Sequence, residues 1–310
     1  MIVTVAQEKG GVGKTTTAKD LAAAAAHAGR RVLAVDVDPQ WALTRQLGIQ
    51  VNTEQAPFSI ADVLAARIDA GDIRITHEEG FDVLPGSRDL RGIEMALVGE
   101  VARETRLGQA LADLQDDYEL VVIDTPPNLG MLTVNALVPA DIVVAPVAAD
   151  DEGAVQGLAE LRATISKLAP LRGGRDGPEL RVIVTRWDGR LRMTTVVEDA
   201  IAALDLPISA RIPARVAVKH ASIFRRSVRA MAPDSGPAIA YHELAHQLLA
   251  AAPTRCASSP PSHPMTLCAP SPRHNPRSAR ARKTEGTRRR RGGDVRHVVR
   301  RQRLCPAPSA

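Results

Sequence analysis

The sequence predicts an α/β fold in which a doubly wound, mostly parallel sheet is flanked by helices. Three observations favour this fold. Short apolar runs of strand length alternate along the chain with longer segments of helical character. The apolar runs are nearly continuous, as expected for strands that are covered on both faces. A glycine-rich turn lies between the first apolar run and the first helical segment, which is a typical start of an α/β domain.

The elements follow from local patterns, taken in chain order. Ile2–Ala6 is a run rich in β-branched residues and predicts the first strand. The alanine-rich segment Lys14–Ala28 predicts a helix that ends at Gly29, and the apolar segment Arg31–Val37 predicts the second strand. Further strands are expected at Phe81–Leu84, Leu120–Ile123, Ile142–Pro146 and Arg181–Thr185. Further helices are expected at Leu90–Leu114, Gly153–Leu168, Thr194–Leu204 and Ala238–Ala251.

Composition limits the class of protein. Apolar residues make up 45% of the chain but aromatic residues only 2%, so the core must be built from Ala, Val, Leu and Ile. No run approaches the roughly 18 consecutive apolar residues of a membrane span, and the N-terminus lacks the features of a signal peptide. We therefore expect a cytoplasmic protein with no membrane partner. The cysteines all lie near the C-terminus, which excludes a disulfide framework elsewhere: Cys256, Cys268 and Cys305.

Charge divides the chain into two parts. Residues 253–310 hold 14 Lys/Arg and 2 Asp/Glu, a net charge of +12, whereas residues 1–252 carry a net charge of −7. The first part, residues 1–252, is expected to form a globular domain. The second is rich in Pro, Ser and Arg without apolar periodicity, and we expect it to be disordered. This basic tail is either a second electrostatic anchor for DNA or an extension without function.

A phosphate-binding loop is expected between the first strand and the first helix. The segment Glu8–Thr16 reads Glu-Lys-Gly-Gly-Val-Gly-Lys-Thr-Thr, and its glycines let backbone N–H groups surround phosphate oxygens. Lys14 is expected to reach the β- and γ-phosphates of a nucleotide, and the Thr15 hydroxyl to bind Mg²⁺. Glu8 stands where the general motif has glycine. The alternative is a glycine-rich turn without a ligand.

The string from Lys9 to Thr15 resembles the deviant Walker A motif of the ParA/MinD superfamily, and most closely that of ParA-type partition ATPases. The resemblance implies a P-loop ATPase with ATP and Mg²⁺ as cofactors. It also implies that Lys9 reaches the ATP of a partner subunit in a sandwich homodimer; the alternative is that Lys9 steadies its own loop. The expected nucleotide-binding residues are Lys9, Gly10, Gly11, Val12, Gly13, Lys14, Thr15 and Thr16.

Three aspartates at predicted strand ends complete the expected site. Asp36 and Asp38 lie in the stretch Asp-Val-Asp-Pro-Gln, and Asp124 ends an apolar strand and precedes Thr-Pro-Pro. In the ParA family the residue matching Asp38 orients the attacking water, so catalysis is assigned to Asp38 together with Lys9 and Lys14. Asp36 and Asp124 are expected to hold Mg²⁺ with Thr15, the aspartates through water. The alternative for Asp36 and Asp38 is that they cap the next helix.

The resemblance to ParA extends over roughly residues 1–251 and implies DNA binding without sequence preference. Six Lys/Arg and no acidic residue fall between positions 211 and 229, a charge pattern suited to neutralising phosphates. An ordinary solvated charged face is the alternative. The candidate DNA contacts are Arg190, Arg192, Arg215, Lys219, Arg225, Arg226 and Arg229.

The sequence thus predicts an ATP-dependent partition ATPase that is associated with the nucleoid, with hydrolysis stimulated by a ParB-like partner. Relatives of the same superfamily that position other cargo are an alternative, because the sequence does not indicate the cargo. Three further alternatives each require a feature that the sequence does not show. A MinD-like membrane-cycling ATPase needs a C-terminal amphipathic helix, where this chain has a proline-rich segment. An iron–sulfur reductase needs cysteines in the globular part, which has none. A metabolic ligase or kinase needs a pocket for a small acceptor, and no motif marks one.

Overall fold

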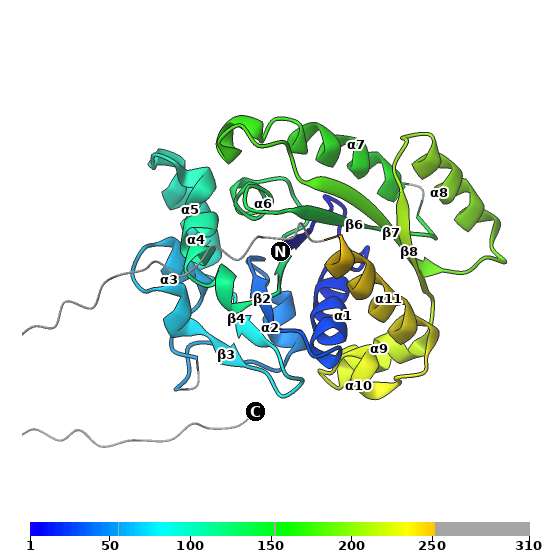
Figure 1. The fold of residues 1–310 in the computed structure, drawn as a ribbon, viewed down its shortest axis with the longest axis horizontal. Helices are drawn as coiled ribbons and strands as arrows, with labels where there is room; N and C mark the ends of the chain where they lie inside the picture. Colours follow the sequence, from blue (N-terminus) through cyan, green and yellow to red (C-terminus); the bar gives the residue numbers. More distant parts are fainter. Residues whose placement is uncertain (55, 152, 252–310) are drawn as a thin grey trace, which may run out of the picture. The chain divides into compact units, whose positions relative to one another are not determined.

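The structure is a computed structural model that describes residues 1–54, 56–151 and 153–251. These residues form an eight-stranded sheet in the order β3-β4-β2-β5-β1-β6-β7-β8 (Figure 1). Neighbouring strands are parallel except β3 and β4, which pair antiparallel. The predicted fold class is therefore confirmed. The expected domain boundary after residue 252 and the basic tail 253–310 lie outside the described residues.

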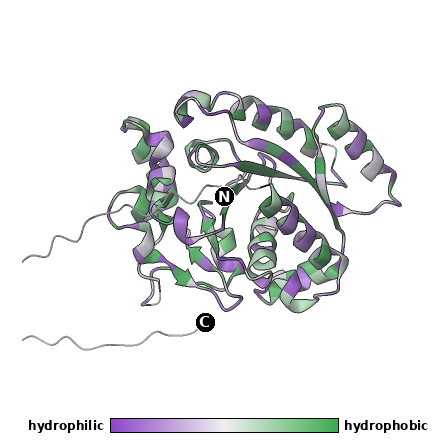
Figure 2. Cartoon of the chain, in the orientation of Figure 1, coloured by the Kyte–Doolittle hydropathy of each residue, from purple (hydrophilic) through white to green (hydrophobic). Residues whose placement is uncertain are grey.

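The central strands are the most buried. Every residue of β1, β2, β5 and β6 is buried, as the continuous apolar runs predict. Figure 2 colours the chain by hydropathy, and hydrophobic residues predominate in these central strands. The strands span Ile2–Val5 (β1), Val32–Asp36 (β2), Ile75–Thr76 (β3), Asp82–Leu84 (β4), Leu120–Asp124 (β5), Ile142–Ala148 (β6), Glu179–Trp187 (β7) and Ile208–Pro213 (β8). Because β1, β2 and β5 are parallel neighbours, their carboxyl ends lie together at one edge of the sheet.

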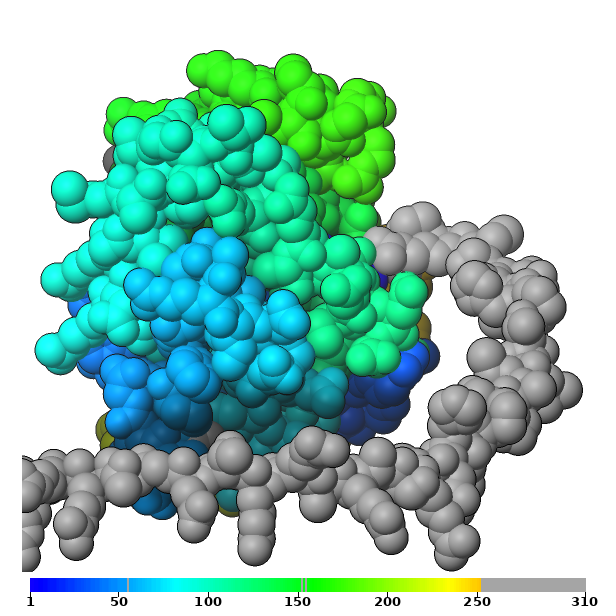
Figure 3. Space-filling view, turned by 90° about the vertical axis from the view of Figure 1, so that its left-hand side faces the viewer, coloured from blue at the N-terminus to red at the C-terminus, as the bar shows by residue number. Residues whose placement is uncertain are grey.

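Helices cover both faces of the sheet. One face packs against α1 (Lys14–His27), α2 (Ala42–Gln46), α9 (Val216–Ile223), α10 (Val228–Met231) and α11 (Gly236–Ala250). The other face packs against α3 (Ile60–Leu64), α4 (Leu90–Ala96), α5 (Arg106–Ala112), α6 (Met131–Leu137), α7 (Gly153–Ile165) and α8 (Arg192–Ala202). Seen from the side of α3, α4 and α5, their segment makes up much of the surface (Figure 3).

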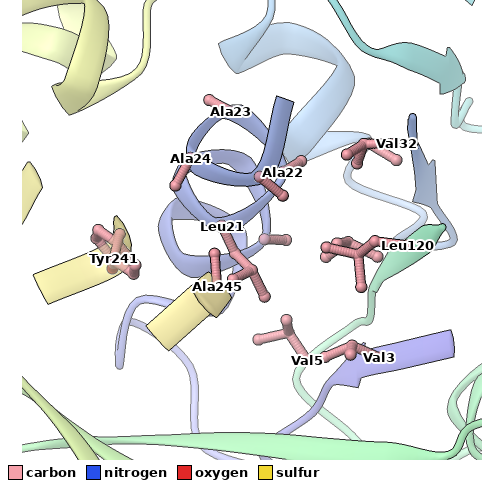
Figure 4. Packing of buried hydrophobic residues seen from close by; sticks show 14 of the residues in the cluster. Val3, Val5, Leu21, Ala22, Ala23, Ala24, Val32, Leu120, Tyr241 and Ala245 are labelled. Atoms are coloured by element: carbon pink, nitrogen blue, oxygen red, sulfur yellow. The ribbon is translucent and has the colours of Figure 1, made fainter. Parts of the chain in front are cut away.

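Helix α1 lies between the sheet and α11 (Figures 1 and 4). Leu21 and the four alanines that follow it, residues 22–25, are buried against strand residues such as Val5 and, on α11, against Tyr241 and Ala245. Alanine side chains are small, so the helix approaches its neighbours closely on more than one side. A second link is polar, because the hydroxyl groups of Thr17 and Tyr241 lie 3.2 Å apart. The loop that precedes α1 is thus fixed to the core of the domain.

One predicted element is wrong. The segment Leu90–Leu114 is not a single helix: α4 ends at Ala96, α5 begins at Arg106, and short 3₁₀ turns lie between them. Ala102 adopts a φ of 55°, a left-handed conformation that an α-helix does not accommodate. The chain also forms β8, α6 and α9, which the local pattern did not indicate.

Candidate nucleotide-binding site

The glycine-rich loop connects the end of β1 to the first turn of α1. Gly11 and Gly13 have φ values of 76° and 99°, which L-residues rarely adopt, so these two positions require glycine. Gly13 is also the N-cap of α1. The first N–H groups of a helix have no partner within the helix, and they face the end of the loop. Such a turn is a ready site for phosphate.

Lys14 lies buried beneath this loop, with 7% of its surface exposed. Its Nζ donates to the backbone oxygen of Lys9 at 2.9 Å. Burial lowers the pKa of Lys14, whereas the nearby carboxylates of Asp124 and Asp38 favour its charged form. The ammonium group is therefore held between the loop and the acidic strand ends, where a phosphate group would meet it.

A residue that the sequence analysis missed also supports the loop. Thr185, near the end of β7, donates from Oγ1 to the backbone oxygen of Val12 at 2.8 Å. A side chain added at Gly13 would contact the methyl group of Thr185 at 3.6 Å. No local motif could have indicated this contact, since 173 positions separate Thr185 from Val12 along the chain.

Asp36 and Asp124 are paired in register at the ends of β2 and β5, and both are fully buried. Their hydrogen bonding differs. Asp36 accepts from the N–H of Thr44 at 2.8 Å, from the Thr44 hydroxyl at 2.6 Å, and from the N–H of Asp38 at 3.1 Å. Neither carboxylate oxygen of Asp124 accepts a hydrogen bond from the described residues, although the Thr15 hydroxyl lies near enough to lower the pKa of Asp124.

Burial dominates the electrostatics of this pair. It raises the pKa of Asp36 to about 6, against the hydrogen bonds from Thr44. It also raises the pKa of Asp124 well above the usual value, and the neighbouring Asp36 adds to this effect. A buried carboxylate without partners is costly unless a cation or proton compensates it. Asp124 beside Thr15 therefore fits a site for Mg²⁺, whose ligands are carboxylate and hydroxyl oxygens or the waters between them.

Asp36 also acts as a cap for the helix that follows it, which is the alternative role for this residue. Thr44 lies in the first turn of α2, and its N–H bonds to the Asp36 carboxylate, as in helix capping. A hydrogen bond from the N–H of Gly86 to the Thr44 hydroxyl extends this network. A side chain at Gly86 would lie 2.8 Å from the Asp36 backbone oxygen, so this position needs glycine. The assignment of Asp36 to magnesium stays a prediction.

Asp38 lies in the loop after β2 and is only 6% exposed. Its Oδ1 accepts from the N–H of Gln40 at 2.8 Å. Burial raises the pKa of Asp38, and the charges of Lys14 and Arg45 oppose that rise. The structure thus brings Asp38, Lys14 and Asp124 into electrostatic contact around the loop, as the sequence predicts.

Lys9 turns to the other side of the loop. Its Nζ donates to Oδ1 of Asp151, just after β6, at 2.5 Å. Both side chains are about one-third exposed. A side chain at Gly153 would come within 2.7 Å of the Lys9 Nζ, so the absence of a Cβ leaves room for this lysine.

The basic residues predicted to contact DNA differ in whether their charges are already engaged by neighbouring groups. Arg190 forms an ion pair with Asp188, Arg226 forms one with Glu78, and Arg229 donates to the backbone oxygen of Pro233. Arg215 and Lys219 are exposed at α9 and form no ion pair within the described part of the chain. Arg192 begins α8, and Arg225 follows α9; both are exposed. Exposed apolar side chains that the sequence analysis missed lie among these residues: Val216, Ile223 and Phe224.

Comparison with known proteins decides the family. The sequence model of a family described as an AAA domain matches residues 1–171. The chromosome-partitioning ATPase Soj of Thermus thermophilus is 37% identical over 253 residues, which cover 80% of this chain and 95% of Soj. The chromosome partitioning protein ParA of Caulobacter vibrioides is 35% identical over 256 residues, which cover 80% of this chain and 93% of ParA. The chain belongs to the ParA/Soj family of ATPases.

A solved structure extends this comparison. Cobyrinic acid a,c-diamide synthase from Mycobacterium smegmatis, with bound ADP and magnesium, is 34% identical, with a TM-score of 0.69. The match covers 80% of this chain and 93% of that one. The prediction of a ParA-type ATPase is confirmed by the family, and that of ATP and Mg²⁺ as cofactors agrees with the nucleotide and metal in this solved relative.

Proposed function

We propose that this ParA-family chain is a DNA partition or positioning ATPase. In this proposal an ATP-bound sandwich homodimer binds DNA without sequence preference, and a ParB-like partner stimulates hydrolysis. The observation that carries the proposal is the unpartnered, buried carboxylate of Asp124, which lies in electrostatic contact with Lys14 at the glycine-rich loop. That arrangement fits a bound metal–nucleotide pair better than it fits an empty core.

The roles of the residues follow from their surroundings. Mg²⁺-ATP supplies the phosphoryl group that is transferred to water. Lys14 and the N–H groups of the loop would bind the phosphates, and Thr15, Asp36 and Asp124 would hold the metal, the two aspartates through water. Asp38 positions the attacking water, because its Oδ1 is oriented by Gln40 and its charge is adjacent to Lys14. Lys9 leaves Asp151 to bind phosphate in the partner subunit.

One helix links the nucleotide loop to the candidate DNA surface. The buried Lys19 of α1 donates from Nζ to the backbone oxygen of Arg226 at 2.7 Å. The next residue, Asp20, accepts from the N–H of Val228 at 2.7 Å. Segment 225–229 is thus anchored to the helix that begins at the phosphate loop. This direct connection supports DNA binding that depends on the bound nucleotide.

The proposed DNA surface is centred on α9 and the loops beside it. Arg215 and Lys219 are exposed there without acidic partners among the described residues, so their charges are available to phosphates. Arg190 and Arg226 contribute less, since each already pairs with a carboxylate. A protein of this kind belongs in the cytoplasm on the nucleoid. No helix of the described residues is long and apolar enough to cross a bilayer.

The test is DNA binding by the full chain with ATP, ADP or no nucleotide. We expect tight binding with ATP only. The double variant Arg215→Ala, Lys219→Ala should weaken binding about equally for all sequences and reduce the salt slope by about 1.8. Arg67→Ala removes a surface arginine that pairs with Asp62 and serves as the control. DNA binding that is equally tight with ATP, ADP and no nucleotide would contradict the proposal. An unchanged salt slope in the double variant would contradict it as well.

The similarity to the cobyrinic acid a,c-diamide synthase of M. smegmatis favours a second candidate function. An amide synthase would hydrolyse ATP in response to a small carboxylic acid and a nitrogen donor rather than to DNA and a partner protein. Measuring ATP turnover with each set of additives separates the two. Sedimentation with liposomes in the presence of ATP likewise tests the membrane-cycling alternative.

A further inference from the structure

A pocket separate from the phosphate loop lies beside the loop that follows Asp38. Its volume is about 510 Å³, within the range of small-molecule sites. The residues that determine its chemistry are Trp41, Arg45, Gly48, Arg88, Asp89 and Arg225. They come from the start of α2, the turn before α4 and the end of α9. Three separate segments of the chain thus bring arginines to one cavity.

The three arginines, Arg45, Arg88 and Arg225, form neither an ion pair nor a side-chain hydrogen bond within the described part of the chain. The charge of Arg45 nevertheless acts on the Asp38 carboxylate. Asp89 is the one acidic residue of the lining, so the lining carries a net charge of +2. A guanidinium group binds oxyanions through two parallel hydrogen bonds. Unpaired arginines around one cavity are therefore suited to a ligand with at least two negative charges.

The indole of Trp41 organises two of these arginines. The guanidinium carbon of Arg88 lies 4.5 Å from the indole centroid, and that of Arg45 lies 5.2 Å from it. Such cation–π contacts orient arginines without neutralising them. Trp41 has a φ of 40°, a left-handed conformation that is unfavourable for a residue with a Cβ. The fold keeps a strained aromatic residue at the point where it holds two cations in place.

Arg225 is fixed from the opposite side. Its side chain packs over Gly48, where an added Cβ would lie 3.3 Å from Cδ of the arginine. Gly48 has a φ of 76°, so a larger residue is disfavoured by its backbone as well as by Arg225. Two residues with left-handed backbone conformations thus shape the pocket. Trp41 places an indole there, and Gly48 leaves room for Arg225.

We infer that this pocket binds a small polyanion that presents two or more phosphate or carboxylate groups to Arg45, Arg88 and Arg225. The site goes beyond the proposed partition function, because it is separate from the phosphate loop and shares only Arg225 with the candidate DNA contacts. It is nevertheless connected to the catalytic segment. The N–H of Trp41 donates to the backbone oxygen of Asp38 at 2.7 Å, and the charge of Arg45 acts on the Asp38 carboxylate. A ligand that engages Arg45 changes the surroundings of Asp38 and thereby regulates ATP turnover.

Pyrophosphate is the probe for this site, with the phosphate loop first saturated by Mg-ADP. The chain has two tryptophans, so the variant Trp187→Phe leaves Trp41 as the sole source of indole fluorescence. We expect a saturable change in that fluorescence, and calorimetry on the unaltered full chain should give the same affinity. Arg88→Ala should weaken pyrophosphate binding about tenfold. The control Arg67→Ala should leave the affinity within about twofold.

Two further experiments distinguish pyrophosphate binding in this pocket from binding at other phosphate sites. Lys14→Ala disables the phosphate loop, and the pyrophosphate signal should persist in that variant. Duplex DNA is titrated in parallel, since its phosphates carry the same chemistry. The inference is overturned if pyrophosphate gives no saturable signal, if Lys14→Ala abolishes it, or if Arg88→Ala and Arg67→Ala bind equally well. A response to DNA alone, without any to pyrophosphate, would likewise exclude a small-ligand site.

Discussion

Lys9 and Asp151, which are 142 positions apart in the chain, form an ion pair with 2.5 Å between Nζ and Oδ1. This pair holds the Lys9 ammonium group against its own subunit, next to the turn before α7. The lysine must leave Asp151 if it is to contact a nucleotide in a partner subunit. A pair whose side chains are each about one-third exposed contributes at most about 1 kcal/mol, so dimerisation can compete with it.

The first prediction concerns this competition. Asp151→Asn removes the intramolecular partner and should tighten ATP-dependent dimerisation about two- to fivefold, as measured by light scattering or sedimentation velocity. Lys9→Ala should retain ATP binding but lose the dimer. An Asp151→Asn protein that dimerises like the unaltered chain would show that the ion pair does not oppose assembly. An ATP-dependent dimer in Lys9→Ala would exclude the role across subunits.

The second prediction separates binding from turnover. Asp38→Ala should bind ATP and dimerise but hydrolyse it at least about 100-fold more slowly, because the attacking water loses its positioning carboxylate. Lys14→Ala should lose nucleotide binding itself, since no other ammonium group lies beneath the loop within the described residues. Nucleotide affinity and single-turnover hydrolysis are measured for both. Normal turnover in Asp38→Ala would remove this residue from its role.

The third prediction contrasts the paired aspartates. Asp124→Asn removes a buried charge without partners and should raise the melting temperature of the nucleotide-free protein by about 2–4 °C. Added Mg-ATP should then stabilise this variant little. Asp36→Asn should lower the melting temperature, because one carboxylate oxygen becomes an NH₂ donor facing the donors of either Thr44 or Asp38. Equal changes in both variants would contradict the different roles assigned to the two residues.

The fourth prediction is a pH dependence. Burial raises the pKa of Asp20 to about 6, with Glu79 adding to the rise and Lys19 opposing it. The unfolded state therefore loses its proton near pH 4, whereas the folded state keeps it until about pH 6. The free energy of unfolding should fall by about 3 kcal/mol from this group as the pH rises through that window, and then level off.

Asp20→Asn keeps this position neutral at every pH and should flatten that part of the curve. Urea denaturation of the nucleotide-free protein between pH 4 and pH 8 measures the slope for both proteins. Identical slopes would show that Asp20 is ionised in the folded state throughout this range.

Much of the fold could be predicted from local pattern. The central strands, α1 and the glycine-rich loop all depend on features within a few residues of one another, such as the run Ile2–Ala6 and the alanines after Leu21. The helix expected at Leu90–Leu114 is interrupted at Ala102, which has a left-handed φ although no proline or glycine at that position predicts a break. Strand β8 was missed because it lies at the edge of the sheet, where most of its residues are only partly buried and form no continuous apolar run.

In the candidate site, too, local features could be predicted from the sequence and long-range contacts could not. The residues of the motif were assigned from the sequence, and the structure brings Lys14, Asp38 and Asp124 together. The partners that orient them were not foreseeable: Thr185 supports Val12, Thr44 bonds to Asp36, and Asp151 binds Lys9. Such contacts arise from the order of strands in the sheet, which brings distant segments together without leaving a local signal.

The packing of α1 against α11 has a consequence for biosynthesis. Helix α1 leaves the ribosome well before α11, because Tyr241, Leu244 and Ala245, which cover its alanine surface, are translated more than 200 residues later. At about 5–20 residues per second, this surface waits for tens of seconds before its cover is made. The nascent chain therefore exposes this apolar surface until α11 has been translated. Chaperones that bind exposed apolar segments are expected to determine how much active protein a cell obtains.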